Sequence, residues 1–322
     1  MKNNKYIYLI FTILILNIFV NSIESESNEV KIVCTNSVLA DFTINLIDKN
    51  VSIDYIMPAG VCPSHFDTSP SDISMIASAD IIISLGWEPW LTSLLESSGN
   101  NNYELIECAN LGEWNIPSGA IKYLEKLKNE LSSLLPSINE TIKTNFNEYI
   151  TLLNDTAEQL QITIINEGYQ NKSVICMEWQ SDFIKWLGLN VISDYPPPES
   201  LSTQDMLNIS NAAQTNEICA IIDNLQSGTD FGARIASESG ASHVIFTNFP
   251  GAIPGTDTYL DMITYNTEQI INGISTYYYK QGEIAKLESY ASILELQRNV
   301  SLFIVVIFGL LASIFLILYK RK

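Results

Sequence analysis

Short apolar runs alternate with amphipathic segments through most of the chain. Helical periodicity fills the intervals between the apolar runs. Strands that alternate with helices are typical of βαβ units, in which neighbouring strands run parallel. The pattern therefore predicts an α/β protein. The predicted strands lie at 30–34, 52–57, 81–84, 103–108, 173–176, 191–193, 220–222 and 243–247.

The two halves of the body resemble each other. Residues 31–34 and 173–176 are both apolar runs that end in cysteine and lead into a helical segment. Between the halves, helical spacing covers 118–135 and 137–166, and Pro136 interrupts it. The predicted parts are an N-terminal lobe, linking helices that include one long backbone helix, and a similar C-terminal lobe, at 23–117, 118–168 and 169–299.

Both ends of the chain are strongly apolar. Residues 1–22 place two lysines before an apolar run and a small residue, which is typical of a secretory signal peptide. Residues 302–319 form an apolar run long enough to span a bilayer, and Lys320, Arg321 and Lys322 follow it. Cations favour the cytoplasmic side. We predict a transmembrane anchor at 300–322 with a basic cytoplasmic tail, and a body held outside the plasma membrane.

Charge and cysteine content narrow the range of partners. The chain has 36 acidic and 17 basic residues, and this excess of negative charge disfavours nucleic acid as a partner. The five cysteines are widely spaced, so no disulfide framework is predicted and their pairing stays open. No nucleophile and base pair and no zinc-protease helix motif is present, so an enzyme is not expected.

One loop carries side chains that bind metal ions. Cys62, His65 and Asp67 lie within six residues of one another, directly after a predicted strand. Residues 69–72 then start a helix, with a capping serine, a proline at the first helical position and an acid in the first turn. A loop between the end of a strand and the start of a helix is where open α/β sheets bind ligands.

The sequence resembles the zinc and manganese binding subunits of ABC importers, the cluster A-I solute-binding proteins. The similarity is carried by residues 60–63 and 66–72, by the Gly-Trp-Glu-Pro-Trp-Leu run at 86–91, and by the Gly-Thr-Asp-Thr-Tyr-Leu-Asp-Met run at 255–262. It implies a monomeric protein of two lobes joined by one long helix. Such a protein captures a transition-metal ion in the cleft between its lobes and delivers it to a permease and its ATPase.

The metal ligands depart from the family's pattern. The family usually offers three histidines and a carboxylate, and those positions here hold Ser64, Gly112, Met177 and Asn248. The chain has only two histidines, and His243 is interpreted as a structural residue at the start of a strand. The predicted ligands come from loops at strand ends: His65, Cys62, Met177, Glu178, Asp223 and Asn248.

The candidate ligands do not determine which ion or molecule the protein binds. Thiolate, thioether and imidazole ligands suit copper(I), zinc or nickel better than manganese. One alternative keeps the fold but binds a small organic ligand or a metal chelate, because Trp87, Trp90, Trp114 and Trp179 could line an apolar pocket. Another alternative is a surface adhesion or interaction protein without a transport role.

Overall fold

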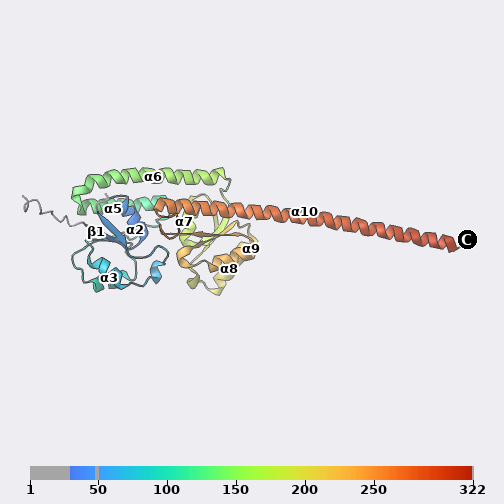
Figure 1. Cartoon of the computed structure of the whole chain (residues 1–322), viewed down its shortest axis with the longest axis horizontal. Helices are drawn as coiled ribbons and strands as arrows, with labels where there is room; N and C mark the ends of the chain where they lie inside the picture. Colours follow the sequence, from blue (N-terminus) through green and yellow to red (C-terminus); the bar gives the residue numbers. More distant parts are fainter. Residues whose placement is uncertain (1–29, 48–50, 321–322) are drawn as a thin grey trace, which may run out of the picture. The chain divides into compact units, whose positions relative to one another are not determined.

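The computed structural model describes residues 30–47 and 51–320, and it confirms the predicted α/β class. The predicted signal peptide lies outside the described residues. The chain divides into two compact units (Figure 1). Unit 1 comprises the chain up to Asn110 together with Tyr123–Tyr149, and unit 2 comprises Leu111–Lys122 and Ile150–Lys322. The lobe boundaries expected from the sequence stay a prediction.

Unit 1 contains a parallel sheet of four strands in the order β2-β1-β3-β4. Every residue of β3 is buried, as expected for a continuous run of isoleucines in a central parallel strand. Ser69 and Asp72 form a capping box at the start of α3, with Pro70 in the first turn, which confirms the helix start read from the sequence. The elements are β1 (Lys31–Cys34), α2 (Ser37–Ile44), β2 (Ser52–Tyr55), η1 (Pro63–His65), α3 (Pro70–Ala77), β3 (Ile81–Ser84), α4 (Leu91–Ser98) and β4 (Glu104–Glu107).

Two long helices follow the first sheet and contribute to both units. Helix α5 (Pro117–Leu134) ends just before Pro136, where a short 3-10 turn, η2 (Pro136–Ile138), separates it from α6 (Asn139–Asn166). The proline interrupts the helix as expected, because it lacks a backbone N–H and its ring clashes with the preceding turn. Helix α6 has 28 residues, and its division between the units falls after Tyr149.

Unit 2 repeats the strand order of unit 1. Its four parallel strands lie in the order β6-β5-β7-β8, so the first strand of the unit, which contains Cys176 as β1 contains Cys34, again occupies the second position. The internal similarity seen in the sequence is therefore a similarity of topology. The elements are β5 (Ser173–Met177), η3 (Glu178–Gln180), α7 (Ser181–Trp186), β6 (Asn190–Tyr195), η4 (Pro198–Ser200), α8 (Thr203–Thr215), β7 (Ala220–Asn224), η5 (Leu225–Ser227), α9 (Asp230–Ser239) and β8 (Ser242–Phe246).

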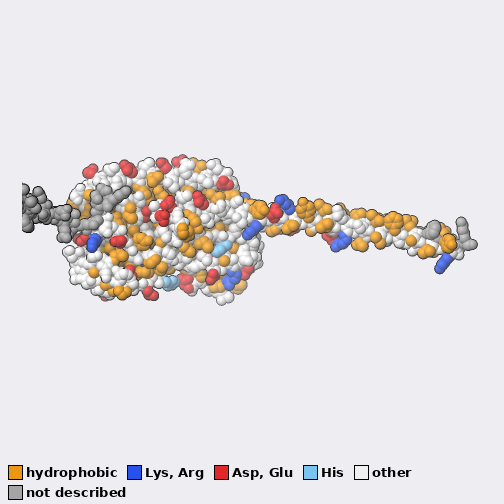
Figure 2. Space-filling view, viewed as in Figure 1, with side chains coloured by type: hydrophobic (Ala, Val, Ile, Leu, Met, Phe, Trp, Pro, Cys, Tyr) orange, Lys and Arg blue, Asp and Glu red, His pale blue; other side chains and the backbone are white. Residues whose placement is uncertain are grey.

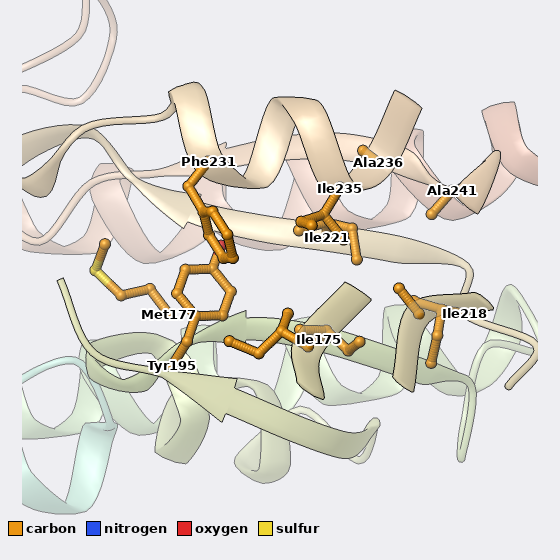
Figure 3. Close-up of a cluster of buried hydrophobic side chains, with 11 residues drawn as sticks. Ile175, Met177, Tyr195, Ile218, Ile221, Phe231, Ile235, Ala236 and Ala241 are labelled. Carbon is orange, nitrogen blue, oxygen red and sulfur yellow. The ribbon is translucent and has the colours of Figure 1, made fainter. Parts of the chain in front are cut away.

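One hydrophobic core cluster of unit 2 lies between the sheet and the helices α8 and α9. Met177, Tyr195 and Phe231 lie next to one another in it (Figure 3). The rings of Tyr195 and Phe231 meet edge to face with their centroids 5.1 Å apart, a favourable aromatic geometry. Met177 pairs in register with Tyr195 across the sheet and is fully buried. This packing fixes the ends of β5 and β6.

The last helix, α10 (Tyr259–Lys320), is one continuous element that runs through residue 299, where the sequence pattern separates the C-terminal lobe from the transmembrane anchor. Gly282 alone does not end it, since a single glycine costs a helix only about 1 kcal/mol relative to alanine. Its first part packs against unit 2 through buried side chains such as Ile270 and Ile274. Its later part exposes apolar side chains (Figure 2), and within the described residues it alone is long and apolar enough to cross a membrane.

Candidate metal site

The predicted ligands Cys62 and His65 lie on the loop after β2 in unit 1. His65 ends the short turn η1 and is exposed, while Cys62 directly precedes this turn and is partly buried. The His65 N–H donates to the carbonyl of Cys62 at 3.0 Å. The indole of Trp90 fixes the turn, because its Nε1 donates to the carbonyl of Pro63 at 3.1 Å. Both candidate ligands therefore lie on a well-anchored loop with access to solvent.

Two other predicted ligands, Met177 and Asp223, are fully buried in unit 2. The thioether of Met177 lies in the apolar core (Figure 3). Asp223 Oδ1 accepts a hydrogen bond from the Tyr195 hydroxyl at 2.5 Å, and Oδ2 lies 2.7 Å from His243 Nε2. Burial and the Asp223 carboxylate raise the pKa of Tyr195. The geometry of both side chains is that of structural residues, and their role as ligands stays a prediction.

Asn248 lies just after β8 and is held by the loop that precedes α5. Trp114 Nε1 donates to its carbonyl at 2.9 Å, and Asn115 Nδ2 donates to its Oδ1 at 3.1 Å. Asn115 Nδ2 also donates to the carbonyl of Trp179 at 2.9 Å. The segments around residues 115, 179 and 248 therefore meet in one place within unit 2.

Glu178, the remaining predicted ligand, begins η3 and is exposed. Burial and the neighbouring Asp194 raise the pKa of its carboxyl group. Glu113 is a residue that the sequence reasoning missed, and burial, followed by the charges of Asp182 and Glu178, raises its pKa. A signal was present, because Glu113 follows Gly112 just as Glu178 follows Met177: each comes one residue after a position where the family has a ligand.

The structure brings the predicted ligands together only in part. Within residues 30–47 and 51–320, no three histidine, cysteine, aspartate or glutamate side chains form a group that could hold a metal ion. Cys62 and His65 are close in unit 1, while Glu178 and Asn248 lie at joined segments of unit 2. Two smaller groups of the predicted residues therefore lie in separate units, and the complete set of six ligands stays a prediction.

All five cysteines are free thiols, and we expect Cys62 alone to react in the native protein. The other four are buried, and burial raises their pKa values, to about 12 for Cys108, so their thiolates are scarce at neutral pH. N-ethylmaleimide followed by peptide mass spectrometry should find one alkylated site before denaturation and five after it. Rapid labelling of Cys34 or Cys176 in native protein would contradict this burial.

Two parallel sheets of the same strand order, with a long helix that contributes to both units, define a solute-binding protein of the helical-backbone class. One family model matches residues 32–273. It describes the periplasmic component A of a zinc-uptake complex, ZnuA. The chain belongs to this family of metal substrate-binding components of ABC importers. Its members bind solutes for a transporter and are not enzymes.

Individual relatives agree with this assignment. The chain is 24% identical over 273 residues to the manganese-binding lipoprotein MntA of Halalkalibacterium halodurans, covering 78% of this chain and 91% of the relative. It is 23% identical to the metal ABC transporter substrate-binding lipoprotein ScbA of Streptococcus cristatus, covering 79% and 92%. The Mn-bound periplasmic metal binding protein of Candidatus Liberibacter asiaticus has the same fold, with a TM-score of 0.63 at 18% identity, over 76% of this chain and 99% of that one.

Proposed function

We propose that this protein captures a divalent transition-metal ion outside the cytoplasm and hands it to an ABC permease that is driven by an ATPase. Membership of the family carries this proposal, because a substrate-binding component implies a permease partner and an extracytoplasmic location. Manganese and zinc are the first candidates, since the relatives include a manganese-binding lipoprotein and the family is that of a zinc-uptake component.

Side-chain donors in each unit support metal capture. Cys62 and His65 offer a thiol and an imidazole in unit 1, and the exposed Glu178 offers carboxylate oxygens in unit 2. Asn248 is buried, and its Oδ1 accepts from Asn115. Thiol and carboxyl groups must lose their protons before they bind a metal ion, so the affinity should fall as the solution becomes more acidic. Met177 and Asp223 are buried, so they can contact the metal ion only after their side chains rearrange.

We further propose that the C-terminal part of α10 anchors the protein in the plasma membrane. It carries exposed apolar side chains such as Leu302, Phe308 and Tyr319, and none of the described part of its most apolar stretch is buried against the body. A helix with this surface is unfavourable in water and favourable in a bilayer. The body would then stand on the outer side, with the basic end of the chain in the cytoplasm.

The proposed function predicts that a metal ion stabilises the full chain. A ligand present at 100 times its dissociation constant stabilises a folded protein by about 2.7 kcal/mol, which raises the midpoint of thermal unfolding. The measurement is thermal unfolding of the detergent-solubilised protein with Zn, Cu, Ni, Co, Fe or Mn at neutral pH. Elemental mass spectrometry of the native protein identifies the bound ion. If no metal shifts the midpoint and none binds stoichiometrically, the proposal fails.

A further inference from the structure

The first part of α10, residues 259–278, is attached to the sheet of unit 2 at several points. The Asn266 side chain accepts from the backbone N–H of Thr247 at 3.1 Å and donates to its carbonyl at 2.9 Å. Further along, a Cβ added at Gly273 would lie 2.4 Å from Val244 Cγ2, so the helix lies directly on β8 at this glycine. These contacts hold α10 against the middle and the end of β8.

Tyr278 is the last point of attachment. The Cys219 thiol donates to its hydroxyl, with Sγ 3.7 Å from the oxygen, and the Lys172 ammonium lies 4.6 Å from the centroid of its ring, a favourable cation–π distance. Lys172 and Cys219 directly precede β5 and β7, which pair with each other in the sheet. The direction in which α10 leaves unit 2 is therefore fixed by the sheet.

Beyond Tyr278 the helix continues without packing against the body of unit 2 (Figure 1). Residues 284–301 are all exposed. Two ion pairs within the helix join side chains three residues apart, Glu283 with Lys286 at 2.7 Å and Glu295 with Arg298 at 2.9 Å. Such exposed pairs favour the helical conformation because only a helix brings side chains at this spacing together.

The exposed part of α10 is expected to be a stable helix because both of its ends are already helical. An isolated helix of this length is marginal in water, since the first turn is costly to form. Packing on unit 2 forms the turns before residue 279, and lipid requires a helix from residue 302 on, because unpaired backbone groups are costly in hydrocarbon. Residues 283–298 contain no proline and are rich in glutamate, leucine and alanine, which are good helix formers.

We propose that residues 279–301 form a rigid stalk that holds unit 2 at a fixed height and in a fixed orientation above the bilayer. The rise of 1.5 Å per residue places Leu302 about 36 Å along the helix axis from Tyr278. The inference rests on the proposed membrane anchor. A flexible tether of the same length would let unit 2 rotate freely and touch the lipid surface, whereas the stalk keeps it away from the lipid.

Two spin labels test the rigidity of the stalk in the full chain, reconstituted in phospholipid nanodiscs. Gln281→Cys and Asn299→Cys place nitroxide labels at exposed positions five helical turns apart, on one face and about 27 Å along the axis. Cys62→Ser removes the one native thiol that is not buried. We expect pulsed electron paramagnetic resonance to give one narrow distribution of distances near 27 Å.

A flexible variant is the matched control for this measurement. Replacing residues 285–291 with glycine and serine keeps the number of residues between the labels but removes the helix, so the distribution of distances should broaden severalfold. A distribution in the parent as broad as that in the glycine and serine variant would overturn the stalk.

Energy transfer to the bilayer tests the height of unit 2. Glu217→Cys, again with Cys62→Ser, carries a donor fluorophore at an exposed position near the start of β7, and the lipid headgroups carry the acceptor. Deleting residues 284–290, about two turns, should bring unit 2 about 10 Å closer to the lipid and increase the transfer. Equal transfer in the parent and the deletion variant would contradict a fixed height.

The outcomes distinguish the stalk from the proposed function on which it rests. If the full chain does not enter nanodiscs, the membrane anchor and the stalk fail together. If it enters them and the label distances are broad, the stalk is wrong and the anchor stands. Metal affinity, measured with Cys62 intact, should be the same in the parent and the deletion variant, because no proposed ligand lies on α10.

Discussion

Replacing Asp223 with alanine is expected to lower the free energy of unfolding of unit 2 by about 3 kcal/mol, because each buried polar group that loses its hydrogen-bond partner costs about 1–3 kcal/mol. The substitution leaves the buried hydroxyl of Tyr195 without its acceptor and removes the partner of His243. Gly232 shows how closely the carboxylate is enclosed, because a Cβ at that position would lie 2.1 Å from Asp223 Oδ2. Urea unfolding of the full chain, followed by circular dichroism, measures the loss.

Asp194 provides the matched control for this prediction. It lies in β6 of the same sheet, is exposed, and accepts one hydrogen bond from the Ser181 hydroxyl at 2.8 Å. Asp194→Ala should therefore cost no more than about 1 kcal/mol. Equal losses for the two alanine variants would show that the buried contacts of Asp223 do not stabilise the unit.

Asp223→Asn tests whether this residue is a ligand or a structural group. Asparagine keeps the shape and one acceptor oxygen, so we expect it to retain most of the stability and all of the metal affinity. A large loss of metal affinity in a folded Asp223→Asn protein would instead favour the role predicted from the sequence.

The second large effect is expected at Gly119, in the first turn of α5. A Cβ added there would lie 1.9 Å from the carbonyl oxygen of Glu113 and 2.9 Å from its carbonyl carbon. Backbone atoms cannot move aside as a flexible side chain can, so Gly119→Ala should destabilise the protein by about 3 kcal/mol. Urea unfolding of the full chain, followed by circular dichroism, measures the loss.

Gly282→Ala is the control for the effect of an added methyl group. Gly282 lies inside α10, and nothing lies within 4 Å of the position that its Cβ would take. Alanine is a better helix former than glycine by about 1 kcal/mol, so this variant should be as stable as the parent or more so. If Gly119→Ala proves equally stable, the close approach of the Glu113 loop to α5 is wrong.

The sequence predicted the fold well because apolar strand runs and the helical spacing of apolar residues both depend only on residues that are close in the sequence. Isoleucine runs such as β3, the capping residues at Ser69 and the proline between α5 and α6 each determine nearby backbone structure without reference to distant residues. The continuity of α10 was missed, because a glycine and a change from amphipathic to apolar composition look like boundaries. Neither is sufficient to end a helix.

The candidate site was harder to predict because its geometry depends on contacts between distant parts of the chain. A methionine at the end of β5 is as compatible with a ligand as with a core residue, and only the position of Phe231 and Tyr195 around Met177 distinguishes them. The partners of Asp223 come from β6 and β8 and cannot be inferred from its neighbours in the sequence. Glu113 was overlooked because its importance depends on the hydrogen bonds of the two residues that follow it.

The free state of all five cysteines has a consequence for how this exported protein matures. Its native state contains no covalent cross-link whose formation would require an oxidising enzyme or whose isomerisation would slow folding. Reducing agents should therefore leave its folded population unchanged, and the polypeptide should reach its native state equally well before or after export.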